Sequence, residues 1–167
     1  MVRIGLPALL FLATVLVGCG SEAELERYYQ LPALAKAAVS EDLDQAQRMA
    51  EELLQLADQH NRDWNYGNAL HDGHMVLGQV ALRRGDAQAA AAFLLKAGET
   101  PGSPQLNSFG PNMRLAQDLL KAGQPDVVLT YFDLCDEFWE MGADRLARWS
   151  AQVRAGDMPS FGANLLY

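Results

Sequence analysis

Residues His74–Gly85 read HMVLGQVALRRG, and residues Asn112–Gly123 read NMRLAQDLLKAG. The two stretches align without gaps at an offset of about 38 residues, which is a period typical of helical-hairpin arrays. Met, Leu, Gln, Leu and Gly coincide, and a cation stands near the end of each stretch, at Arg83 and Lys121. Because a single hairpin cannot bury its apolar face alone, the repeat predicts hairpins that stack on one another.

The sequence after residue 21 predicts helices with no strand, because Ala, Leu, Gln, Glu and Arg dominate and β-branched residues are scarce. Asp86 suits an N-cap, and Pro111 and Pro125 suit the first turns of helices. Breaks are expected at Ser40, Gly85-Asp86, Gly98–Pro111, Gly123–Pro125, Gly142 and Gly156. The expected helices therefore span 22–38, 41–58, 66–84, 87–97, 111–122, 125–141 and 143–155.

The middle unit carries a resemblance to a known repeat family in Leu77-Gly78, Gly85-Asp86, Ala90, Leu94 and Ala97. This pattern resembles the tetratricopeptide repeat (TPR), in which small residues occupy the close helix crossings. The resemblance implies an all-α fold over 24–156, with about three TPR-like stacked helical hairpins plus a C-terminal capping helix. Extra residues in His60–Gly67 and Glu99–Gly110 depart from the usual repeat length, and a generic helical bundle is the alternative.

The last predicted helix, 143–155, has Leu146, Trp149 and Val153 at helical spacing on one face. A half-polar helix of this kind suits the exposed edge of a final hairpin. The tail, 157–167, ends in Leu165-Leu166-Tyr167, and either folds back onto the domain or is captured by a partner.

The N-terminal segment contains Leu16-Val17-Gly18-Cys19 after an apolar run from Ile4 to Val17. The run is shorter than the ~20 residues that a membrane-spanning helix needs. It resembles a bacterial lipoprotein signal, which implies removal of residues 1–18, lipidation of Cys19 and a short tether over 19–23. Gly20 after the cysteine favours the outer membrane by the same resemblance, with the domain in the periplasm. An ordinary secretory signal or an uncleaved anchor remains the alternative.

The net charge of −8 makes the chain acidic, and removal of Arg3 with the signal makes it more so. Nucleic-acid phosphates and anionic lipid head groups repel such a domain. We therefore expect no nucleic-acid binding, and a membrane attachment that depends on the covalent lipid. Cys135, among Phe132, Leu134 and Phe138, is expected to be a buried hydrophobe.

In TPR proteins the first helices of successive hairpins line a concave groove. By this resemblance, the candidate peptide-binding residues are two quartets: Met75, Gln79, Leu82 and Arg83, followed by Met113, Gln117, Leu120 and Lys121. Such a groove could hold an extended or helical peptide. The alternative is that the Met and Leu side chains belong to the core.

His60, His71 and His74 form a weaker alternative as metal ligands, because imidazole suits zinc or copper. No HExxH motif, nucleophile elbow or glycine-rich phosphate loop occurs in the sequence, which favours a non-enzymatic protein without a cofactor. The leading hypothesis is a lipid-anchored envelope adaptor that binds a protein or peptide through its concave face. The alternative hypothesis is an envelope lipoprotein that binds a metal or a small molecule.

Overall fold

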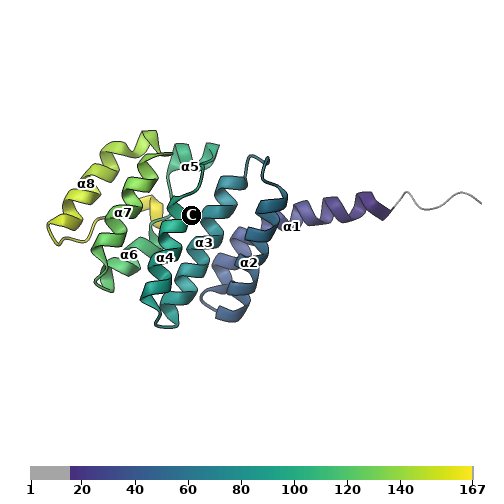
Figure 1. Cartoon of the computed structure of the whole chain (residues 1–167), viewed down its shortest axis with the longest axis horizontal. Coiled ribbons are helices and arrows are strands. Elements are labelled where there is room, and N and C mark those ends of the chain that lie inside the picture. Colours follow the sequence, from purple (N-terminus) through teal and green to yellow (C-terminus); the bar gives the residue numbers. More distant parts are fainter. Residues whose placement is uncertain (1–15, 167) are drawn as a thin grey trace, which may run out of the picture.

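The computed structural model describes residues 16–166 of the chain, with side chains from residue 22 onward. This part of the chain folds into eight α-helices, packed in sequential antiparallel pairs, and contains no strand (Figure 1). The helices are α1 (Leu16–Ala38), α2 (Leu43–Gln59), α3 (Tyr66–Arg83), α4 (Ala87–Gly98), α5 (Pro104–Phe109), α6 (Arg114–Lys121), α7 (Pro125–Asp136) and α8 (Ala143–Arg154). The predicted all-α fold class is confirmed.

Most helix boundaries lie where the sequence predicts them. The Asp42 side chain caps α2 by accepting from the backbone N–H groups of Asp44 and Gln45. Asp86 caps α4 by accepting from Ala89, as expected. Gly85 and Gly123 have φ angles of 85° and 74°, in the left-handed region that glycine tolerates best, and each follows the end of a helix.

Helix α3 lies at the centre of the fold and packs against both α2 and α4. Small residues allow the close approach: Ala46 and Ala50 of α2 are fully buried, as is Ala90 of α4. A Cβ added at Gly78 of α3 would lie 2.2 Å from a methyl carbon of Leu115. The glycine therefore brings the pair of α3 and α4 into direct contact with α6.

Two predicted boundaries are wrong around the segment between α4 and α7. The helix expected from Pro111 begins at Arg114, because tertiary hydrogen bonds engage the backbone before it. The Met113 N–H donates to the Asn164 carbonyl, and the Asn112 carbonyl oxygen lies 3.0 Å from the Tyr131 hydroxyl oxygen. The preceding loop also contains α5, which the sequence analysis did not predict.

The helix expected over 125–141 ends at Asp136 instead. The indole of Trp139 turns inward there and is 1% exposed. A Cβ at Gly110 or at Gly142 would lie 2.4 or 2.0 Å from the indole, respectively. The large ring is therefore packed against two positions that must lack a side chain, which stops the helix from continuing.

The C-terminal end of the chain folds back onto the helices. Leu146, Trp149 and Val153 of α8 are buried against the rest of the domain, as their spacing predicts. Cys135 is also buried, as predicted, and burial raises the pKa of its thiol. In the tail, the Asn164 side-chain amide donates to the carbonyls of Phe109 and Pro111. The described part of the tail, up to Leu166, thus returns to the middle of the molecule and does not extend beyond α8 (Figure 1).

A close backbone contact at the start of α3 gives a testable prediction. A Cβ at Gly67 would lie 1.8 Å from the carbonyl oxygen of Gly102, whereas the closest atoms to one at Gly73 would belong to the flexible Leu54 side chain, at 2.8 Å. We expect Gly67→Ala to lower the free energy of unfolding by about 2 kcal/mol or more, since backbone atoms must move. Gly73→Ala should stay within about 1 kcal/mol of the wild type, because its gain in helix propensity offsets the displacement of Leu54.

Urea unfolding of the full-length chain in mild detergent, followed by circular dichroism, measures both variants. Equal losses of stability in the two would contradict this account of the Gly67 contact.

Candidate functional site

A cavity of about 640 Å³ lies between α1, α3 and α5. Its walls combine apolar side chains, such as Pro32 and Leu106, with several polar groups at the base. The volume lies within the range of about 300–1,000 Å³ that is usual for binding pockets. The residues that line it include Tyr29, Lys36, Trp64, Asn65, Asn68, His71, Asp72, Gln105, Asn112 and Leu166.

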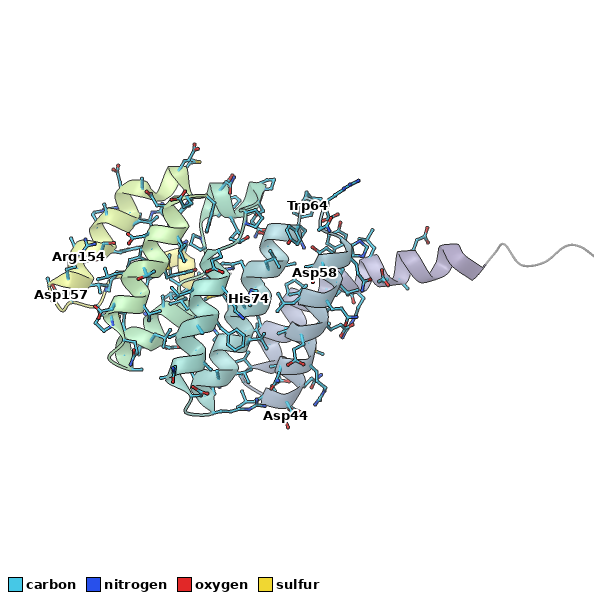
Figure 2. All side chains as sticks on the ribbon, viewed as in Figure 1. Asp44, Asp58, Trp64, His74, Arg154 and Asp157 are labelled. Carbon is cyan, nitrogen blue, oxygen red and sulfur yellow. The ribbon has the colours of Figure 1, made fainter. Side chains whose placement is uncertain are left out.

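Tyr29 and Trp64 form an aromatic rim on this first cavity. Their rings are stacked, with centroids 6.0 Å apart and an interplanar angle of 19°. The Tyr29 hydroxyl donates to Asp63, which fixes the ring. Trp64 is nevertheless 59% exposed, and Figure 2 shows it at the edge of the domain. A large exposed indole held in place in this way is available for contact with a ligand.

A network of buried amides forms one part of the cavity base. The Asn68 side chain donates to Asn65, at 2.8 Å, and to Gln105, at 3.3 Å. The hydroxyl of Ser103 donates to the side-chain oxygen of Asn68, at 2.6 Å. Asn65 and Asn68 are each 7% exposed. The network ties the start of α3 to the segment that carries α5, and so holds the two cavity walls at a set distance.

His71 lies deeper in the base and is 1% exposed. Its Nε2 atom lies 3.1 Å from the hydroxyl oxygen of Tyr131, which in turn lies 3.0 Å from the carbonyl oxygen of Asn112. The hydroxyl has one proton, so it donates either to this carbonyl, while accepting from Nε2–H, or to an unprotonated Nε2. Either arrangement holds the imidazole rigidly at the bottom of the cavity.

Asp72 and Lys36 form an ion pair beside His71. The Lys36 ammonium lies 2.8 Å from one oxygen of Asp72, and Nδ1 of His71 lies 3.4 Å from the other. Burial by itself raises the pKa of the Asp72 carboxyl, but the hydrogen bond from His71 and the charge of Lys36 outweigh it. The pKa of Asp72 therefore lies below its usual value, and the carboxylate is charged at neutral pH.

The first cavity continues into two others. It shares Lys36, Asn112 and Leu166 with a second cavity of about 340 Å³. The second cavity shares Gln79, Arg83 and Arg114 with a third of about 310 Å³. We refer to the three together as the groove. Its walls come from α1, α3, α5, α6 and the C-terminal tail.

Three of the eight residues proposed from the repeat, Gln79, Leu82 and Arg83, line the groove. Met75 and Met113 do not, because they are 3% and 0% exposed and belong to the core. Leu120 packs partly against this core.

Gln117 and Lys121 hydrogen-bond to each other and line none of the three cavities. The groove side of α6 instead presents Arg114 and Asp118, one position later than the aligned Met113 and Gln117.

The three histidines of the alternative metal hypothesis lie in separate surroundings. Nε2 of His60 lies 3.3 Å from a Glu24 oxygen, outside hydrogen-bond alignment, and its ring packs on Tyr28. His74 donates from Nδ1 to the Leu70 carbonyl, and burial lowers the pKa of its ring. Across residues 22–166, no group of three His, Cys, Asp or Glu side chains is arranged to hold a metal ion.

The predicted signal, residues 1–18, and the side chain of Cys19 lie outside the residues that the structure describes in full. None of the helices in the described part of the chain is long and apolar enough to cross a membrane. Comparisons of the chain with protein-family models, curated proteins and solved structures found no match.

Sequence reasoning missed most of the first cavity, including Trp64, Asn68, Gln105 and the role of His71 in its base. It also missed the Tyr131 hydroxyl that His71 contacts. One signal was available: Thr100–Met113 is dense in small polar residues, with Thr100, Ser103, Gln105, Asn107, Ser108 and Asn112 in fourteen positions. Such a segment is unusual for a plain connection between two helices, because it offers many hydrogen-bonding side chains to its neighbours.

The Asp72 ion pair predicts how stability depends on pH. Because the folded pKa of Asp72 lies below its unfolded value of about 3.9, the unfolded chain binds more protons in this range, and the carboxylate stabilises the folded chain above that pH. This contribution is lost as the pH falls through the folded pKa. We expect Asp72→Asn to be less stable than the wild type at pH 7 and to lose less stability between about pH 5 and pH 3.

Urea unfolding at several pH values measures this difference. Asp58→Asn, an exposed carboxylate on α2 that is labelled in Figure 2, is the matched control and should keep the wild-type slope. Parallel pH profiles for the wild type and Asp72→Asn would contradict the assignment.

Proposed function

We propose that the chain is a lipid-anchored, TPR-like scaffold of a bacterial envelope, which binds a protein or peptide in the groove. The observation that carries this proposal is the course of the groove along α1, α3 and the start of α6, the first helices of successive antiparallel pairs. In stacked helical hairpins this is the surface that successive units extend, and an extended ligand can follow it.

The form of the groove supports an extended peptide. The first cavity, with its exposed rim of Tyr29 and Trp64, is large enough for one bulky side chain of a ligand. The second and third cavities offer the polar side chains of Gln79, Arg83 and Arg114 farther along. Aromatic anchors surrounded by polar contacts are the usual composition of a protein-binding surface.

The proposed anchor rests on the Leu16-Val17-Gly18-Cys19 motif. Anionic lipid repels a domain of net negative charge, so acyl chains on Cys19 are the attachment that this sequence offers. The outer membrane, with the domain in the periplasm, follows from Gly20 by the resemblance to lipoproteins.

A second candidate, binding of a small molecule, is favoured by the first cavity alone. Its volume and its rigid polar base of Asn68 and His71 suit a compact ligand. The two candidates differ in the rest of the groove, since a compact ligand would not need Gln79 or Arg83.

Crosslinked capture from intact membranes tests the scaffold proposal. We expect the full chain with Tyr29→Ala and Trp64→Ala to recover its specific partner at least about tenfold less well, because an exposed aromatic anchor commonly contributes about 2 kcal/mol to binding. The control carries Met141→Ala and Met158→Ala, two exposed apolar side chains that line none of the three cavities, and should recover the partner as the wild type does.

Recovery of the same proteins by both variants, or of no specific protein by the wild type, would count against the groove as a protein-binding surface. Cys19→Ala separates the anchor from the groove, since it should either release the folded domain or leave an unprocessed precursor, and should in both cases leave capture by the groove intact.

A further inference from the structure

The second cavity, of about 340 Å³, is lined by cationic side chains and by no acidic side chain among residues 22–166. Lys36 enters it from α1, Arg83 from the end of α3, and Arg114 from the start of α6, with the Gln79 amide between them. The chain as a whole has 21 acidic against 13 basic residues. Three cations line this cavity with no acidic side chain of the described residues beside them, which is the reverse of the chain's overall acidic charge.

The two guanidinium groups lack carboxylate partners among the side chains of residues 22–166. Arg83 donates from one terminal nitrogen to the Val39 carbonyl, at 3.1 Å, and Arg114 donates to the Leu165 carbonyl, at 2.8 Å. These bonds to backbone oxygens hold each group at the wall of the cavity. A guanidinium has five N–H donors, so both retain donors for a ligand.

The acidic side chains that line the other two cavities, Asp72 and Asp118, already pair with cations. Asp72, in the first cavity, is paired with Lys36, at 2.8 Å. Asp118, in the third cavity, is paired with Lys121, at 3.0 Å. Neither carboxylate lines the second cavity. Arg83 and Arg114 can therefore bind an anion supplied by a ligand.

We propose that the second cavity is a carboxylate-binding subsite, which receives an acidic side chain or a terminal carboxylate of the peptide in the groove. The proposal rests on the proposed function and adds the chemistry of the ligand. Arginine binds carboxylates through two parallel N–H···O bonds, which fix orientation as well as charge. Such a contact would set the register of a peptide whose bulky residue occupies the first cavity.

Nuclear magnetic resonance of the full chain in detergent micelles tests the subsite. The probes are acetyl-Ala-Glu-Ala-Glu-Ala-amide, the same peptide with Gln in place of Glu, and inorganic phosphate. We expect the Glu peptide to bind at least about tenfold more tightly than the Gln peptide, because bonds to charged groups are the stronger ones. Its shifts should concentrate on the Nε–H groups of Arg83 and Arg114 and on the Gln79 amide.

Two double variants with the same change in charge sharpen the test. Arg83→Gln with Arg114→Gln should bind the Glu and Gln peptides equally. Arg48→Gln with Arg154→Gln, exposed positions on α2 and α8 that line none of the three cavities, should keep the preference for Glu. Arg154 lies near the end of the molecule farthest from α1 (Figure 2).

Equal binding of the Glu and Gln peptides to the wild type would overturn the proposal, as would equal losses in the two double variants. Phosphate that binds as tightly as the Glu peptide would also overturn it, in favour of a site for free anions. If the preference for Glu disappears while Tyr29→Ala with Trp64→Ala still abolishes partner capture, the subsite fails and the proposed function stands.

Discussion

The structure depends on the attachment of one connecting segment to the start of α3. The Thr100 hydroxyl donates to the Gly67 carbonyl, at 2.8 Å, and the Ser103 hydroxyl donates to Asn68, at 2.6 Å. Both hydroxyls are buried, so losing either bond would leave a desolvated polar group. The approach of Gly102 to Gly67 is closer than any side chain would permit. Together these contacts turn the link between α4 and α6 into a wall of the groove.

The consequences of this attachment extend to the far end of the chain. Once the segment is held against α3, α5 faces α1 across the first cavity, and the backbone before α6 is available for tertiary bonds. Asn164 of the tail makes these bonds: its side-chain amide donates to the Phe109 and Pro111 carbonyls, and its backbone carbonyl accepts from the Met113 N–H. The tail then contributes Leu165 and Leu166 to the groove. Segments distant in sequence thus build one surface around α3.

The helical architecture could be predicted from the sequence because its signals are local. Asp86 caps α4 through a contact with Ala89, three residues away, which needs no distant part of the chain. Leu146, Trp149 and Val153 share one face of α8 because of their spacing alone. The groove depends instead on long-range pairs, such as His71 with Tyr131, which no local pattern specifies. Gln79 and Arg83, which the repeat singles out on α3, line the groove, whereas the aligned Gln117 and Lys121 of α6 line none of its cavities.

Site-specific photocrosslinking in living cells tests the central claim, that the groove is the surface that contacts a partner. A photoreactive residue would replace Ala33 or Gln105, exposed residues that line the first cavity, or else Gln55 on α2 or Gln88 on α4, exposed residues outside the three cavities. The account predicts a common adduct from Ala33 and Gln105 and none of that mass from Gln55 or Gln88. The same adduct from all four positions, or from Gln55 and Gln88 alone, would contradict it.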